Sequence, residues 1–180
     1  MNFKKAVQVG NKVIRAKALP VLNVKSKTTR RIVQDLTDSM RYCGLVGMAG
    51  PQIGKGLRIF VTEIRKTRNR KDQEMRDIDP LRIFINPRIM SVSKKEIRGW
   101  EGCGSVAHGG LFGMVRRPAS VVVEAYDENG DKFIIKTSNL LARVIQHEMD
   151  HLNGIVFVDK ADPKTYMSRD EYLKFRAKGN

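Results

Sequence analysis

The segment ARVIQHEMDHLNG, residues 142–154, constrains the fold most, because it predicts a helix with polar groups on its buried face. At about 100° per residue, most of the apolar residues and three polar ones fall within an arc of roughly 160°. This arc holds Leu140, Leu141, Val144, Ile145, His147, Glu148, His151 and Leu152, while Ala142, Arg143, Gln146, Met149 and Asp150 occupy the rest. Two imidazoles and one carboxylate are therefore expected to face the protein interior.

An inward glutamate beside two inward histidines needs a partner. Burying an unpaired carboxylate costs several kcal/mol, and a bound divalent metal ion offsets that cost. His147 and His151 stand one helical turn apart with Glu148 between them, which is the H-E-x-x-H pattern of two metal ligands and a general base. The alternative is a pair of hydrogen-bonded core histidines that happen to be four residues apart.

A catalytic metal also needs a third protein ligand and an open position. No His or Cys follows His151, and the later carboxylates lie in a region that we expect to be mostly loop and tail. These carboxylates include Asp159, Asp162 and Glu171. Upstream, Cys103 is a better candidate than His108, because metal binding stabilises a thiolate.

The chain has the length and composition of one globular domain, 1–180, because 180 residues that are 41% hydrophobic can bury a core. No apolar run approaches the length of a membrane span, and the first residues lack the apolar core and cleavage site of a signal peptide. The two cysteines, Cys43 and Cys103, cannot make a disulfide framework, which favours a reducing compartment.

Periodicity and turn residues along the chain predict an α+β fold. The expected elements are a helix over 28–42, strands over 57–63 and 81–87, a charged surface loop over 65–80, a hairpin around Asn129-Gly130 and a short helix over 169–177. With the helix around 140–152, this order indicates mixed or antiparallel β-sheets packed around a central metal-binding helix.

The net charge of +15 comes from 34 Lys and Arg against 19 Asp and Glu. A charge this large serves either solubility or a polyanionic partner. Basic residues cluster in 65–71 and 174–180, and we expect 168–180 to form a basic helix and tail. Aromatic residues do not alternate with these charges, so we interpret them as solvated surface that can face RNA without sequence-specific binding.

Three motifs resemble those of the peptide deformylases, in the same order and at compatible spacing. They are GLVGMAGPQIG at 44–54, EGCGS at 101–105 and QHEMDH at 146–151. The resemblance covers nearly the whole chain, and EGCGSVA and DKADPKTY are nearer to the mitochondrial-type branch than to common bacterial forms. It implies a peptide deformylase-like fold and removal of the formyl group from N-formylmethionine at the start of nascent polypeptides.

The resemblance also implies the cofactor and its ligands. One divalent ion per chain is expected on Cys103, His147 and His151, natively Fe²⁺, with Zn²⁺, Ni²⁺ or Co²⁺ as alternatives. A water on the metal would attack the formyl carbon while Glu148 takes its proton and returns it to the departing amine. The side-chain amide of Gln52 would donate a hydrogen bond to the oxyanion.

By analogy with the family, the backbone N–H of Gly104 is the second oxyanion donor. Val46 and Gly47 are expected to meet the substrate backbone, since a glycine admits close approach and an edge segment can pair with an extended peptide. Val144 and Ile145 are candidates for the methionine pocket, with ordinary core packing as the alternative.

Residues on the other side of the helix have two interpretations. Gln146 and Asp150, or Arg143, can orient the metal ligands from behind, or they can lie on an exposed helix surface.

The chain departs from the deformylase motifs at several positions. Leu45 and Gly50 replace a glycine and an alanine, which predicts a looser turn. Gly104 replaces a side-chain-bearing residue, which predicts a more mobile oxyanion loop and reduced turnover. Ala107 replaces a common proline. Asn139 stands where a glycine often precedes the helix, a position that Asn tolerates at positive φ.

Two other functions remain as alternatives. One is a different metallopeptidase or amidase with the same metal centre, and the other is a low-activity, deformylase-like protein associated with the ribosome. For an active deformylase the expected partners are N-formylmethionyl nascent peptides and the ribosome near its exit tunnel, with no membrane. The expected location is the bacterial cytoplasm, or the mitochondrial matrix if a targeting peptide precedes this sequence.

Overall fold

A computed structural model describes residues 3–65 and 78–177 of the chain. Five strands form one antiparallel sheet in the order β1-β2-β3-β6-β7, namely Gly47–Ala49, Ile59–Ile64, Asp79–Val92, Ser120–Tyr126 and Lys132–Ser138. Three strands form a second antiparallel sheet in the order β4-β5-β8, namely Glu96–Gly102, Leu111–Pro118 and Ala161–Ser168. The helices are α1 (Lys12–Arg15), α2 (Lys27–Tyr42), α3 (Asn139–Leu152) and α4 (Arg169–Ala177), with short 3₁₀ turns at Gly50–Ile53, Ala107–Gly109 and Phe157–Asp159.

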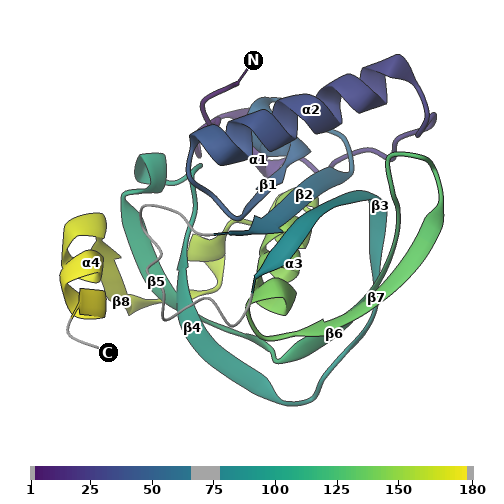
Figure 1. The fold of residues 1–180 in the computed structure, drawn as a ribbon. Coiled ribbons are helices and arrows are strands. Elements are labelled where there is room, and N and C mark those ends of the chain that lie inside the picture. Colours follow the sequence, from purple (N-terminus) through teal and green to yellow (C-terminus); the bar gives the residue numbers. More distant parts are fainter. Residues whose placement is uncertain (1–2, 66–77, 178–180) are drawn as a thin grey trace.

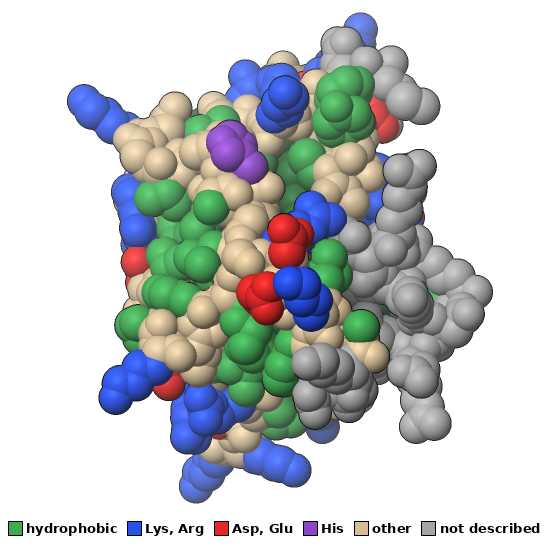
Figure 2. All heavy atoms as spheres, turned by 90° about the vertical axis from the view of Figure 1, so that its left-hand side faces the viewer, with side chains coloured by type: hydrophobic (Ala, Val, Ile, Leu, Met, Phe, Trp, Pro, Cys, Tyr) green, Lys and Arg blue, Asp and Glu red, His purple; other side chains and the backbone are tan. Residues whose placement is uncertain are grey.

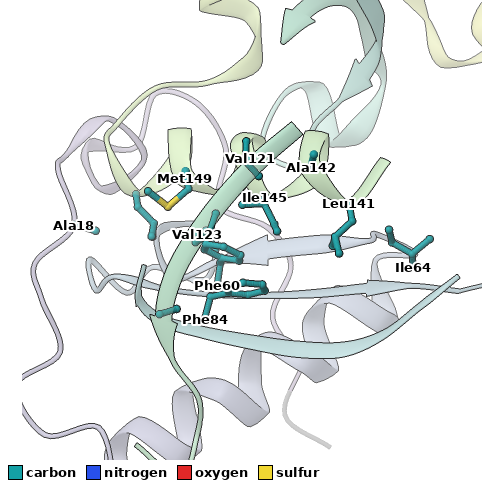
Figure 3. Close-up of a cluster of buried hydrophobic side chains, with 13 residues drawn as sticks. Ala18, Phe60, Ile64, Phe84, Val121, Val123, Leu141, Ala142, Ile145 and Met149 are labelled. Atoms are coloured by element: carbon teal, nitrogen blue, oxygen red, sulfur yellow. The ribbon is translucent and has the colours of Figure 1, made fainter. Parts of the chain in front are cut away.

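The larger sheet is buried on both faces around β2, with α2 on one face and α3 on the other (Figure 1). Side chains alternate along a strand, so Phe60 joins the cluster under α3 while Ile59 and Val61 join the cluster under α2. Phe60 stacks on Phe84 of β3 at 4.5 Å between ring centroids, and Ile145 of α3 points toward both rings (Figure 3). This packing fixes the position of α3 against β1 and β2.

Helix α3 is central, because the smaller sheet packs on the side that the larger sheet leaves open. Residues outside the predicted apolar arc are therefore buried as well, with Gln146 only 6% and Asp150 only 7% exposed. An exposed helix surface at these two positions is thus excluded. The helix begins at Asn139, whose φ of 57° is positive, a conformation that Asn tolerates.

The structure confirms several predicted elements and extends others. The predicted helices appear as α2 and α4, and the hairpin around Asn129-Gly130 joins β6 to β7, although only Gly130 takes a positive φ, of 79°. Most of the predicted loop, 66–77, lies outside the described residues. No helix in the described part of the chain is long and apolar enough to cross a membrane.

The strand predicted to end at Pro87 continues to Val92 as part of β3. A register shift between Ile85 and Arg88, with Asn86 at φ 51°, forms an irregularity that accommodates the proline within the strand. The sequence did not predict β4, β5 or β8. The expectation that the chain between α3 and the predicted C-terminal helix is mostly loop was wrong, because Ala161–Ser168 forms β8 and completes the smaller sheet.

Candidate metal centre

The structure brings together the three residues expected to bind a metal. His147 and His151 project from α3, and Cys103 follows directly after β4 of the smaller sheet. One potential ligand atom from each of the three lies within 4.8 Å of the others, and Cys103 Sγ is 3.2 Å from His151 Nε2. His108, the alternative third ligand, is exposed and is not part of this group.

The chemistry of these donors fits a divalent metal. Burial opposes ionisation of the Cys103 thiol, but the imidazoles of His151 and His147 outweigh it, so the thiol pKa lies well below its usual value. A buried thiolate with two imidazoles is a ligand set for zinc, ferrous iron, nickel or cobalt. His151 Nδ1 is buried without a hydrogen-bond partner among the described residues, whereas its Nε2 faces the thiol.

Glu101 fixes the orientation of His147. Its Oε2 lies 2.9 Å from His147 Nδ1, which leaves Nε2 as the nitrogen available to a metal. Arg117 donates to both carboxylate oxygens of Glu101 at 2.6 and 2.8 Å, and Arg143 donates to Oε1 at 2.8 Å. Burial alone would raise the Glu101 pKa, but Arg117 and His147 hold it well below its usual value.

The network behind His147 continues to the C-terminal half of α3. Arg117 donates to Asp150 at 2.7 Å, and Lys160 donates to the same carboxylate at 2.6 Å. Asp150 and Arg143 therefore contact the groups that orient the ligands, as the sequence proposed. Gln146 does not, because its amide donates to the carbonyls of Ala142 and Pro118. The sequence missed Arg117 and assigned no role to Glu101, although Glu101 begins the EGCGS motif.

The Glu148 carboxylate is buried, and its Oε2 has no hydrogen-bond partner among the described residues. Burial raises the pKa of Glu148 to about 7, although the neighbouring imidazoles of His147 and His151 partly offset this effect. Gly47 lies against this carboxylate so closely that an added Cβ would collide with Glu148 Oε1 and lie 2.8 Å from Val144 Cγ1. A glycine at position 47 thus allows β1 to approach the Glu148 carboxylate.

Gln52 points its amide group toward the thiol. Its Oε1 accepts a hydrogen bond from the Ala49 N–H at 2.8 Å, which fixes the direction of the amide. Its Nε2 then lies 3.4 Å from Ser105 Oγ and 3.6 Å from Cys103 Sγ. Gly104 is the residue between these two partners, so both predicted oxyanion donors lie beside Cys103.

Strand β1 is an edge strand of the described sheet, since it pairs only with β2. The Val46 carbonyl accepts from the Glu63 N–H at 2.9 Å, so backbone alternation directs the N–H and C=O of Gly47 away from β2. Val144 contacts this edge, whereas Ile145 belongs to the core cluster with Phe60. Val144 therefore remains a candidate for the substrate pocket, and Ile145 is a core residue.

The sequence pattern of the polypeptide deformylase family matches residues 3–166. The chain belongs to the polypeptide deformylase family. Peptide deformylase 2 of a Nostoc species is 32% identical over 96% of this chain and 94% of that protein. Human mitochondrial peptide deformylase is 34% identical over 91% of this chain and 70% of that protein. The class I type b peptide deformylase of Acinetobacter baumannii, solved with Met-Ala-Ser bound, has a TM-score of 0.78 at 26% identity, covering 86% of this chain and 96% of that one.

Membership in the deformylase family establishes the reaction as well as the fold. The chain is a hydrolase that removes the formyl group from N-formylmethionine peptides. The Cys103, His147 and His151 group provides one candidate site for the metal ion of this deformylase.

Leu45 and Gly104, two positions at which the chain departs from the deformylase motifs, lie next to each other. A Cβ added at Gly104 would lie 2.9 Å from Leu45 Cδ1, so a side chain at 104 and the Leu45 side chain compete for the same room. At Gly50, a Cβ would lie 2.7 Å from the Leu57 carbonyl oxygen. The turn is therefore closely packed, and the expectation of a looser turn does not hold. Higher mobility of the Gly104 loop and reduced turnover stay predictions.

Proposed function

We propose that Cys103, His147 and His151 hold a single Fe²⁺ ion and that Glu148 is the general base of deformylation. The observation that carries this proposal is the buried Glu148 carboxylate, whose Oε2 has no partner among the described residues although it adjoins all three ligands. When bound, the ion supplies Lewis-acid chemistry that polarises the formyl oxygen and makes water more acidic.

Glu148 moves the proton of the reaction. With a pKa of about 7, its Oε2 can accept a proton from the attacking water near neutral pH and pass it to the departing amine. Glu101 keeps its proton-free form and holds His147 Nδ1, so it does not compete for that proton. The two buried glutamates thus have separate tasks.

Gln52 and Gly104 stabilise the charge that develops on the formyl oxygen. The Gln52 amide is aimed by the Ala49 N–H toward Cys103, and the Gly104 N–H is adjacent in the same loop. One such donor contributes about 2.7–4 kcal/mol to the transition state. Because the Ala49 N–H holds the Gln52 amide, this donor needs little rearrangement during the reaction.

The free edge of β1 holds the substrate. Gly47, next to Val46, presents the backbone groups to which an extended formyl-peptide can pair, and the same backbone lies against Glu148. Pairing there places the first peptide residue beside the base. Val144, which contacts Gly47 from α3, lines the pocket for the methionine side chain.

Replacing Glu148 by glutamine tests the assignment of the base. Glu148→Gln retains the size of the side chain but cannot accept the proton, so kcat should fall by about 10²–10⁴ with metal content unchanged. Glu63→Gln, at a carboxylate on β2 that pairs with Arg41, is the matched control and should retain kcat. Full turnover by metal-loaded Glu148→Gln would overturn the assignment.

The proposal of ferrous iron has its own test. Activity should be lost during storage in air, because Fe²⁺ or the Cys103 thiolate is oxidised. Parallel samples kept under nitrogen should retain both activity and iron. Equal activity after prolonged aerobic storage would contradict iron and favour zinc or nickel.

We also propose one catalytic domain over 1–180 that docks on the ribosome near the emerging chain. On the face of Figure 2, which carries α4, Lys and Arg side chains project mainly around the edge. The proposed contact residues are the Lys and Arg in 65–71 and 174–178, and 66–71 and 178 lie outside the described residues. The site of action is the bacterial cytoplasm or the mitochondrial matrix, where such chains are made.

Co-sedimentation with ribosomes tests this docking. Replacing the Lys and Arg of both clusters by Gln should weaken ribosome binding and make it less dependent on salt concentration. With fewer protein cations on the RNA phosphates, fewer counterions are released from the RNA on binding. Unchanged binding by this variant would exclude the proposed surface.

A further inference from the structure

The segment before α1 crosses the loop that carries the proposed oxyanion donors. The Val7 N–H donates to the Gln52 carbonyl at 2.8 Å, and the Val9 N–H donates to the Ser105 carbonyl at 2.8 Å. The short stretch 7–9 is thus hydrogen-bonded to Gln52 and to Ser105, which lie 45 or more positions away from it in the sequence. The N-terminal segment therefore contacts the backbone of Gln52 and of Ser105, the residue after Gly104.

Gln8 stands between these two backbone contacts and makes its own. Its Nε2 donates to the Gly104 carbonyl at 2.8 Å and to the Ala6 carbonyl at 2.8 Å. Its Oε1 accepts from the His108 N–H at 2.9 Å. One half-buried side chain therefore joins both ends of the loop from Gly104 to His108 with two hydrogen bonds, and a third bond, to Ala6, ties it to its own segment.

The far end of that loop has an unfavourable backbone conformation. Ala107 and His108 are consecutive non-glycine residues with φ of 46° and 53°. Such conformations cost about 1–3 kcal/mol each and persist only where surrounding contacts hold them. The bond from the His108 N–H to Gln8 is one of these contacts, so Gln8 helps to maintain the conformation that follows the oxyanion loop.

The near end of the loop lacks a side chain of its own. Gly104 has wide backbone freedom, and rotation there changes the relation between its N–H and the rest of the loop. Leu45 and Ala6 fill the space beside it, at 2.9 and 3.4 Å from the position of an added Cβ. These apolar contacts limit translation, whereas the hydrogen bond from Gln8 fixes the direction of the Gly104 carbonyl.

We propose that Gln8 is a positioning residue: by holding the Gly104 carbonyl it restricts rotation about the backbone bonds of Gly104, so that the Gly104 N–H on the preceding peptide unit stays directed at the developing oxyanion. The inference rests on the role proposed for Gly104. In this chain, a hydrogen bond from the N-terminal segment does the ordering that a side chain at position 104 cannot do. Gln8 should therefore affect kcat, because an oxyanion donor stabilises charge that develops only in the transition state.

Gln8→Glu is the sharpest test, because it keeps the size and the acceptor for His108 but cannot donate to Gly104 when ionised. With N-formyl-Met-Ala-Ser and metal-loaded enzyme, we expect kcat to fall about tenfold with KM unchanged, less than the 10²–10³ for complete loss of a donor. Gln8→Ala should show at least the same loss. Hydrogen exchange of the 104–109 amides should become faster in both variants.

Asn11→Ala is the matched control. It removes another side chain-to-backbone bond of the N-terminal segment, from the Val13 N–H to Asn11 Oδ1, without touching the loop. It should leave kcat and the exchange of the 104–109 amides unchanged. A merely structural role for Gln8 predicts a lower Tm for its variants with normal kcat on the folded enzyme, and that result would overturn the inference.

The same assay separates this inference from the function on which it rests. Wild-type turnover with unchanged kcat in Gln8→Glu and Gln8→Ala would remove the role of Gln8 and leave the deformylase assignment intact. Absence of turnover in metal-loaded wild type would overturn the proposed site, and the role of Gln8 with it.

Discussion

Glu101 and Glu148 are both buried beside His147, yet their carboxylates have opposite properties. Burial would raise the pKa of each, but the guanidinium of Arg117 and the imidazole of His147 reverse the effect at Glu101. At Glu148 burial dominates and the pKa is raised to about 7. Of the two, only Glu148 can therefore exchange a proton near neutral pH, while Glu101 stays an anion that orients the His147 ring.

Replacing Glu101 by glutamine should weaken metal binding while the proposed base, Glu148, is retained. Glu101→Gln removes the charge that faces His147, Arg117 and Arg143, so metal affinity should fall about 10–100-fold, as for other partners of metal-bound histidine. Competition with a chelator measures this affinity. Glu124→Gln, whose carboxylate pairs with Lys132 in the larger sheet, is the control. Equal affinities of Glu101→Gln and wild type would contradict the role of Glu101.

Helix α3 and strand β2 were predictable because each has one dominant pattern: helical spacing of apolar residues in the first and a continuous apolar run in the second. Strands β4 and β8 have no such pattern, since each mixes charged residues with apolar ones in the smaller sheet. The contact of Arg117 with Glu101 was equally hidden, because pairing of β4 with β5 and packing on α3 create it. The motif residues were therefore predictable, and Asp150 and Arg143 were proposed as supporting residues, whereas Arg117 and the role of Glu101 were not predicted.

The close approach of β1 to α3 makes Gly47 a sensitive position. Gly47→Ala should destabilise the protein by about 1–3 kcal/mol through overpacking, and it should raise KM because β1 is displaced from Glu148 and Val144. Gly56→Ala is the control, since an added Cβ there meets only Val13 Cγ2, at 4.0 Å. Urea unfolding and steady-state kinetics measure both effects. A Gly47→Ala enzyme with wild-type KM would show that β1 does not hold the substrate.

Two sheets enclose one helix in this molecule, and its surface has a large excess of positive charge. With 34 Lys and Arg against 19 Asp and Glu, most carboxylates can find a cationic partner, and each loss of a carboxylate charge increases repulsion. Glu63 accepts from Arg41 at 2.7 and 2.9 Å, and this hydrogen bond lowers its pKa below the ordinary 4.5. Such pairs link the stability of the whole fold to pH.

The sign of this linkage follows from the lowered pKa. Glu63 contributes its stability fully above its ordinary pKa of 4.5 and loses it as the pH falls through the lower folded-state value. Glu63→Gln should therefore reduce the free energy of unfolding by about 0.5 kcal/mol at pH 7, since Arg41 is solvent-accessible, and by nothing measurable at pH 3. Urea unfolding at pH 7, 5 and 3 measures the difference. An equal difference at all three pH values would contradict this assignment.

The most direct test of the account is release of formate from N-formyl-Met-Ala-Ser by anaerobically purified protein, with elemental analysis of the same sample. A single three-ligand deformylase site predicts formate release with about one metal ion per chain. It also predicts that Glu148→Ala, with its metal retained, releases almost none. A fully metal-loaded wild type that releases no formate, or that prefers unformylated peptides, would contradict the account.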